Sequence, residues 1–121
     1  MSTDPRHRLG RIGERLAGEH LQRLGYEILT RNHRTRFGEL DLIAFDGVRI
    51  VFCEVKTRRA PGDPFESLHP AKQRQVRKMA ALWLIEAPNR PRASELRFDA
   101  IGITIDATGR LSRLEHLEGA F

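Results

Sequence analysis

The chain has 121 residues, with 21 Lys or Arg and 16 Asp or Glu, so its formal charge at pH 7 is +5. This length allows one hydrophobic core and excludes two full domains, so we expect a single domain over residues 1–121. No apolar run approaches the roughly 20 residues that span a bilayer, and the N-terminus has no apolar signal segment. These features predict a cytoplasmic protein without a membrane partner.

The first predicted element is an amphipathic helix. Apolar residues recur every three or four positions from about residue 8 to residue 24, and Gly25 ends the pattern. Glu14 lies at the edge of the apolar stripe, from where it can reach across the surface that the helix covers. His20 lies near the middle of the stripe, and we interpret it as a core histidine with a satisfied hydrogen bond.

Three strands follow this helix. The segment YEILTRN is typical of a strand, and the next two strands flank Asp46-Gly47, a dipeptide that favours a tight hairpin turn. Cys53 lies among apolar residues of the third strand, so we interpret it as a small core residue rather than a nucleophile.

A second helix and one or two more strands complete the chain. Pro70 suits the first turn of a helix that extends to about Glu86. LRFDAIGITID then predicts another strand, and RLSRLEHL predicts a weaker strand at an edge. The order αβββαβ(β) indicates an α/β fold with a mixed central sheet flanked by helices.

The hairpin strands carry four charged residues that core strands normally lack, namely Glu39, Asp41, Glu54 and Lys56. A two-residue turn sets Asp41 opposite Phe52 and Glu39 opposite Glu54. Because side chains alternate along a strand, all four charged side chains are then expected on one face. The opposite face would hold Leu40, Leu42, Val51, Cys53 and Val55.

On such a face the Asp41 and Glu54 carboxylates can converge, and like charges this close repel unless a cation lies between them. Oxygen ligands without His or Cys suit Mg²⁺ or Mn²⁺. The metal would activate a water molecule, while Lys56 would orient or deprotonate the nucleophile or offset transition-state charge. The set predicts phosphodiester hydrolysis, and the alternative is a group of surface ion pairs.

Two basic clusters, RNHRTR at 31–36 and KQRQVRK at 72–78, fit a phosphate backbone as partner. A solvated charged face is the alternative for either cluster alone. Arg58, shortly after the E-x-K segment, is a further candidate. The cations expected to contact nucleic acid are Arg31, Arg34, Arg36, Arg58, Lys72, Arg74, Arg77 and Lys78.

An Asp on one hairpin strand and E-x-K on the next resemble the PD-(D/E)XK nuclease superfamily. Four motifs in this order, GERLAGEHLQRLGYEILTRN, GELDLIA, FCEVKTR and RFDAIGI, resemble the YraN-like bacterial family, a functionally uncharacterised group. The resemblance covers almost the whole chain. It implies a restriction-endonuclease-like core, similar to that of Holliday junction resolvases.

Residue by residue, the resemblance implies metal ligation by Asp41 and Glu54, with the superfamily lysine at Lys56. Glu14 matches the first-helix glutamate that resolvases add to this site as a further catalytic and metal-binding residue. Leu40 stands where the superfamily signature has proline.

The remaining matches have supporting roles. Glu39 is additional and is expected to be an outer-shell partner or a ligand of a second metal. Gln73 resembles a helix residue that some superfamily members direct at the site, and Lys72 is the alternative. Arg97 and Asp99 belong to the family pattern, and we expect them to support the structure.

We therefore expect a Mg²⁺- or Mn²⁺-dependent endonuclease that acts on DNA, with branched or otherwise structured DNA among the candidate substrates. Two alternatives stay open: an RNA-directed nuclease with the same chemistry, and a non-catalytic nucleic-acid-binding module. Junction resolvases act as two-fold dimers, so a homodimer is compatible with the first expectation.

Overall fold

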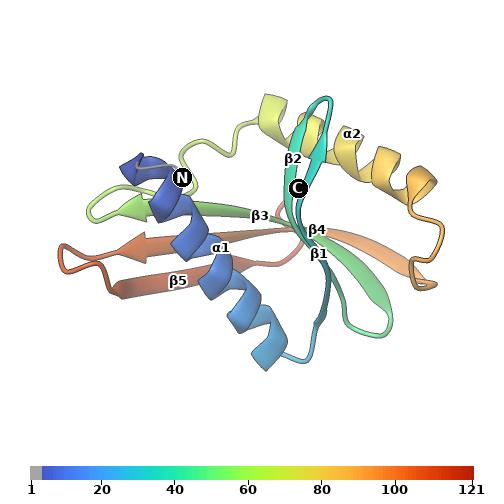
Figure 1. The fold of residues 1–121 in the computed structure, drawn as a ribbon, viewed down its shortest axis with the longest axis horizontal. Coiled ribbons are helices and arrows are strands. Elements are labelled where there is room, and N and C mark those ends of the chain that lie inside the picture. Colours follow the sequence, from blue (N-terminus) through green and yellow to red (C-terminus); the bar gives the residue numbers. More distant parts are fainter. Residues whose placement is uncertain (1–3) are drawn as a thin grey trace.

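The computed structural model describes residues 4–121, which form two helices and five strands (Figure 1). In chain order these are α1 (Pro5–Arg23), β1 (Glu27–Thr35), β2 (Gly38–Phe45), β3 (Arg49–Arg59), α2 (Pro70–Glu86), β4 (Glu95–Ile105) and β5 (Leu111–Leu117). The predicted order is confirmed, and the weak C-terminal segment is a true strand. Neither helix in the described part of the chain has the length and apolarity needed to cross a membrane.

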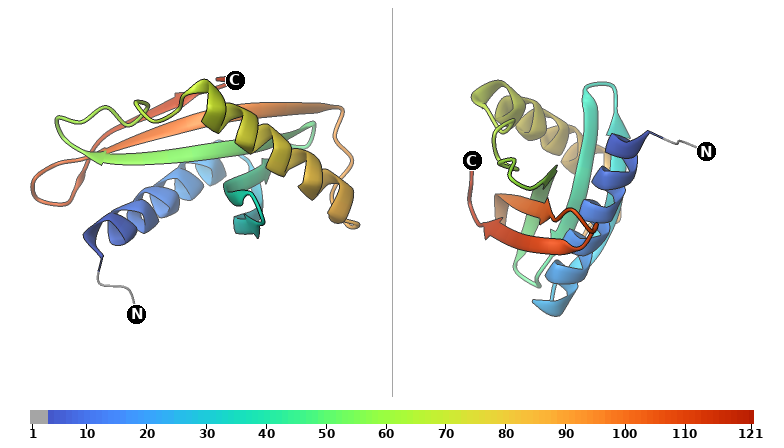
Figure 2. Two further views of the ribbon diagram at one scale, coloured as in Figure 1. Left: turned by 90° about the horizontal axis from the view of Figure 1, so that it is seen from above. Right: turned by 90° about the vertical axis from the view of Figure 1, so that its left-hand side faces the viewer.

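All five strands belong to one sheet, in the order β1-β2-β3-β4-β5. Strands β3 and β4 run parallel, with α2 in the connection between them, and the other three neighbouring pairs are antiparallel. The helices lie on opposite faces of the sheet (Figure 2). The predicted mixed sheet flanked by helices is therefore confirmed.

Each helix covers a core of its own. On the α1 face, Ala17 and Leu21 pack with β-strand residues that include Cys53. On the α2 face, Met79 and Trp83 pack in a cluster that includes Phe52. Burial raises the pKa of the Cys53 thiol well above its usual value, as expected for a core cysteine.

The β2–β3 turn is longer than the sequence predicts. The Asp46 side chain accepts the N–H groups of Val48 and Arg49, at 2.8 and 2.6 Å, and Phe45 pairs with Ile50 instead of Val48. The turn therefore has four residues between the last paired positions. Because the turn is longer, the residue that pairs with Phe52 is Ile43 and not the predicted Asp41.

Strand β2 separates from β3 before it reaches Asp41. The ladder between them ends at the pair Leu42 and Cys53, whereas β1 pairs with β2 as far as Gly38. Leu40 packs on the α2 face and Leu42 on the α1 face, so the prediction that they share one face is wrong. The regular alternation of side chains is thus interrupted in the part of β2 that pairs with β1 but no longer with β3.

Candidate functional site

Three carboxylates meet beside the gap between β2 and β3. Glu14 from α1 and Glu39 and Asp41 from β2 each bring one oxygen within 4.8 Å of the others. The Asp41 carboxylate accepts the N–H of Val55 at 2.8 Å, which fixes it at the point where the strands separate. Such a group of half-buried oxygens has the chemistry of a site for a hard divalent cation.

The electrostatics of this group follow from burial and crowding. Burial raises the pKa of Asp41 well above its usual value, and repulsion from Glu54 raises it further against the effect of the Val55 hydrogen bond. Burial and then Glu39 raise the pKa of Glu14, while a side-chain hydrogen bond from Asn32 lowers it. A cation bound among these oxygens would relieve the repulsion.

Glu54 lies close to this group but does not belong to it. Its side chain is 3% exposed, and its Oε1 lies 3.1 Å from Lys56 Nζ and 3.5 Å from Lys72 Nζ. Its Oε2 is buried without a hydrogen-bond partner among the described residues. A buried carboxylate oxygen left unsatisfied is costly, which marks this atom as a position for an additional partner such as a cation or water.

The predicted geometry of the site needs correction in two respects. Glu39, expected in the outer shell or at a second metal, lies in the same oxygen group as Glu14 and Asp41, and Glu54 does not. The hairpin carboxylates also do not converge as one set, because Glu39 and Asp41 meet Glu14 of α1, whereas Glu54 meets Lys72 of α2. The site is therefore built at the strand gap between the two helices.

Two cavities flank the N-terminal half of α1, and both contain Glu14. The first, of about 620 Å³, lies between α1 and β1 and also contains Glu39; we call it the α1–β1 groove. The second, of about 630 Å³, contains Lys56 and Arg58. Of the cations predicted to contact nucleic acid, Arg31 and Arg34 line the α1–β1 groove and Arg58 lines the second cavity.

Most of the α2 cluster lines neither of these cavities, so only part of each predicted basic cluster is found beside the acidic residues. Arg77 stacks on Phe98 at 4.6 Å, and Arg36 and Lys78 lie over the Phe37 ring at 4.9 and 4.0 Å. Arg77 and Lys78 thus contact aromatic rings that are distant from them in the sequence, whereas Phe37 directly follows Arg36.

The other members of the α2 cluster differ among themselves. Arg74 is exposed and lines neither cavity. Gln73 donates a hydrogen bond to the carbonyl oxygen of Leu68 at 3.3 Å. Only Lys72 contacts an acidic residue of the site, so the structure favours Lys72 over Gln73 as the supporting residue from α2.

Sequence reasoning missed several residues of the α1–β1 groove. Arg6, Arg11 and Arg15 line it from α1, and the four-residue spacing of the last two is the signal that could have found them. Asn32 lines it from β1 with a φ of 52°, a conformation that is uncommon for residues other than glycine. No sequence pattern indicates the interaction of Asn32 with Glu14.

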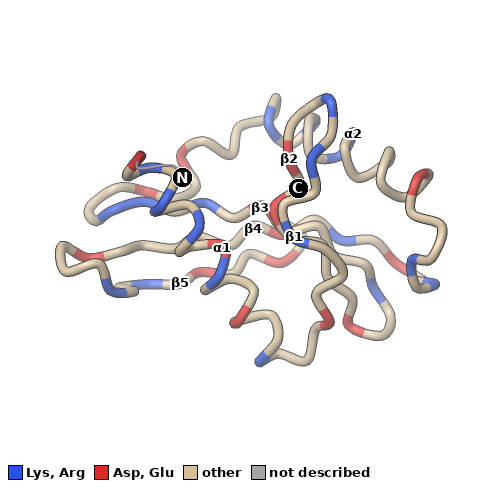
Figure 3. The backbone as a smooth tube through the Cα atoms, in the orientation of Figure 1, with Lys and Arg blue, Asp and Glu red and all other residues tan. Residues whose placement is uncertain are grey.

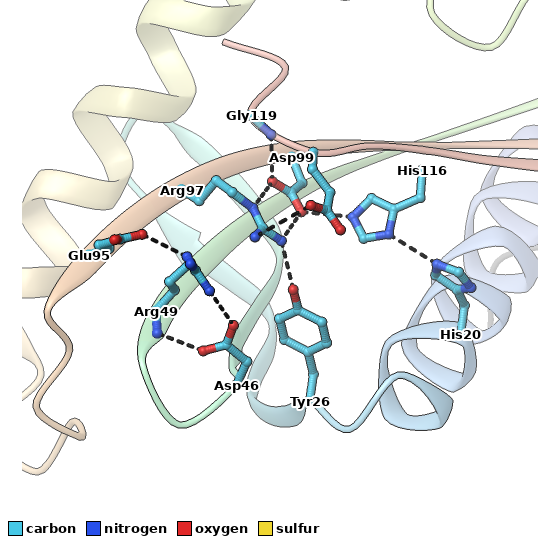
Figure 4. A network of polar contacts seen from close by, with 10 residues as sticks. His20, Tyr26, Asp46, Arg49, Glu95, Arg97, Asp99, His116 and Gly119 are labelled. Carbon is cyan, nitrogen blue, oxygen red and sulfur yellow. Dashed lines mark hydrogen bonds and ion pairs between the residues drawn. The ribbon is translucent and has the colours of Figure 1, made fainter.

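Arg97 and Asp99 form a separate polar network around a fully buried carboxylate (Figure 4). Arg97 donates two hydrogen bonds of 2.8 Å to Asp99 and one of 2.6 Å to the Tyr26 hydroxyl. His116 Nε2 lies 2.7 Å from Asp99, and His116 Nδ1 lies 3.0 Å from His20 Nε2. The network connects α1, β4 and β5, in agreement with the expected structural roles.

The sequence profile of the uncharacterised protein family UPF0102 matches residues 13–103. A UPF0102 protein of Frankia casuarinae is 46% identical over 115 residues, which cover 93% of this chain and 95% of the relative. UPF0102 proteins of Acidothermus cellulolyticus and Chlorobium limicola are 44% and 45% identical, with at least 96% of each chain covered. The chain therefore belongs to the UPF0102 family, the YraN-like family that its motifs resemble.

Proposed function

We propose that this protein is a Mg²⁺- or Mn²⁺-dependent phosphodiesterase, an endonuclease that cleaves nucleic acid, with DNA favoured over RNA. One observation carries the proposal. The carboxylates of Glu14, Glu39 and Asp41 converge beside the Glu54–Lys56 ion pair, and Glu14 and Glu39 lie in a cavity lined by arginines. Figure 3 shows the positions of the acidic and basic residues along the backbone.

The residues present fit a hard divalent cation. The donors are carboxylate oxygens without His or Cys, and the buried Glu54 Oε2 has no protein partner among residues 4–121. Glu14, Glu39 and Asp41 would hold the cation, with Glu54 as a neighbouring donor. When bound, Mg²⁺ or Mn²⁺ would lower the pKa of a water molecule and polarise a phosphoryl oxygen.

The chain's own residues supply position and charge. The Val55 N–H fixes the Asp41 carboxylate, and Asn32 restrains Glu14. Glu54 holds the Lys56 ammonium group at 3.1 Å, and Lys56 is only 18% exposed. From this position Lys56 can orient the attacking water, accept its proton in the neutral form, or stabilise negative charge on the phosphate.

A cleavage panel tests the function. Labelled linear duplex, single strand, four-way junction, flap and structured RNA are each incubated with Mg²⁺, Mn²⁺ or EDTA. We expect cleavage of at least one DNA substrate that requires the divalent ion. Cleavage confined to RNA would replace DNA with RNA as the substrate and leave the chemistry unchanged.

Two variants separate an enzyme from a binding module. Asp41→Asn keeps the shape of the side chain and removes a negative donor, so Mn²⁺ binding should weaken. Lys56→Ala keeps all four carboxylates, so it should spare Mn²⁺ binding. Both should cleave at least about a hundredfold more slowly than wild type while still binding nucleic acid.

Glu86→Gln is a suitable control, because it removes an exposed carboxylate at the end of α2, outside the oxygen group and both cavities. It should leave cleavage and Mn²⁺ binding unchanged. The proposal fails if the wild type shows no divalent-dependent cleavage across the panel and Asp41→Asn alters neither Mn²⁺ binding nor affinity for nucleic acid. A non-catalytic binding module would then take its place.

A further inference from the structure

Helix α1 carries cations in places that disfavour an isolated helix. Arg11 and Arg15 are exposed and four residues apart, a spacing at which like charges repel. The first turn includes Arg6 but no acidic residue, although the helix dipole favours negative charge at this end. Asp4 at the N-cap, 3.8 Å from Arg6, and Glu19, 3.3 Å from Arg15, offset part of this positive charge. An anionic partner along this side of α1 would offset more of it.

A second row of cations faces this side of α1 from β1. Arg31 and Arg34 line the same α1–β1 groove as the three α1 arginines. Arg31 reaches the helix itself, because a Cβ atom built on Gly18 would lie 2.4 Å from its Nη1. The groove is therefore bordered by arginines on both sides, with Glu14 and Glu39 between them.

We propose that the α1–β1 groove binds the sugar–phosphate backbone of nucleic acid and that Arg11 and Arg15 contact its phosphates. The inference rests on the proposed function, because a backbone held here lies beside Glu14 and Glu39. No Phe, Tyr or Trp is among the described residues that line the groove. Binding is therefore driven by charge and independent of base sequence, since stacking platforms for bases are missing.

The opposite face of the sheet offers a matched comparison. Arg74 and Arg77 on α2 also contribute two positive charges, and they were candidates from the sequence. Arg77 stacks on Phe98, and neither residue lines the groove. Charge removed from α2 should therefore have little effect on binding if the path of the backbone runs along α1.

The test measures binding to a labelled 20-base-pair duplex and to a single strand of the same length. EDTA prevents divalent-dependent cleavage, and the salt concentration is varied. For Arg11→Gln/Arg15→Gln, the slope of log K against log salt should become shallower by about 1.8 on duplex or about 1.4 on single strand, two phosphate contacts in each case. Affinity at 0.1 M salt should fall at least about tenfold.

The Arg74→Gln/Arg77→Gln variant should keep the slope of the wild type, and circular dichroism melting should establish that both variants are folded. The inference is overturned if the α1 variant keeps the wild-type slope, if the α2 variant loses as much as the α1 variant, or if the wild type binds neither oligonucleotide at low salt.

Cleavage assays distinguish this inference from the proposed function. If the wild type cleaves with Mg²⁺ and the α1 variant binds and cleaves normally, the groove inference fails and the function stands. If the α1 variant loses binding but the wild type never cleaves, the groove inference stands and the nuclease proposal fails.

Discussion

Replacing Asp99 with Asn removes the charge at the centre of the network that joins β4, β5 and α1. The Asp99 side chain is fully buried and accepts hydrogen bonds from Arg97, His116 and the Gly119 N–H. The substitution preserves size but places an amide where three donors converge. It should therefore destabilise the fold without touching the acidic site.

The size of the effect follows from the pKa of Asp99. Burial alone would raise this pKa, but hydrogen bonds from His116, Arg97 and Gly119 outweigh burial and hold it at about 2, against an ordinary value of 3.8. Each pKa unit corresponds to about 1.4 kcal/mol, so ionised Asp99 contributes about 2 kcal/mol to the free energy of unfolding. Because the folded-state pKa is lowered, this contribution is present above about pH 4 and is lost as the pH falls towards 2.

Urea denaturation of wild type and Asp99→Asn between pH 7 and pH 2 measures this contribution. The variant should be less stable by at least about 2 kcal/mol at pH 7, and the difference should shrink between about pH 4 and pH 2. Subtracting the two curves removes the carboxylates that both proteins share. A difference that is absent at pH 7, or that does not vary with pH, would refute the role assigned to Asp99.

Two further predictions concern helix α1. A Cβ on Gly13 would lie 1.7 Å from Thr57 Oγ1, whereas a Cβ on Gly10 meets nothing within 4 Å. Gly13→Ala should therefore lower the free energy of unfolding by about 1–3 kcal/mol, while Gly10→Ala should raise it by about 0.5–1 kcal/mol. Thermal melting measures both changes. Equal effects of the two changes would contradict the close packing of α1 on β3. Burial, followed by His116 and Arg23, lowers the pKa of His20 below 6.5, so the folded state resists protonation and its stability should fall as the pH drops below about 6.5. His20→Gln should lose less stability than wild type between pH 7 and pH 5 in denaturation curves, and an equal loss would show that His20 does not carry this dependence.

The sequence by itself determined the order of the elements and the kinds of residue at the site. Helix and strand periods are local properties, so the second helix could be predicted from Pro70 to Glu86, its actual bounds. The charged residues Asp41, Glu54 and Lys56 could also be recognised from the sequence, because core strands rarely carry charged residues.

Tertiary structure decided which of these groups meet. The Asp46 side chain caps a four-residue turn, which changed the pairing of β2 with β3. The separation of the strands before Asp41 then brought Glu39 to Glu14 and left Glu54 with Lys56 and Lys72. None of this follows from a local period, since it depends on where two strands stop pairing.

The positions of the cations were also decided in three dimensions. Lys78 and Arg77 lie in a basic stretch of sequence but contact aromatic rings, whereas Arg11 and Arg15 line the groove from a helix outside both basic stretches. Local sequence shows that a side chain is charged and on which stripe of a helix it lies. Which surface that stripe faces depends on how the helix docks on the sheet, and docking is set by the packing of residues far apart in the chain.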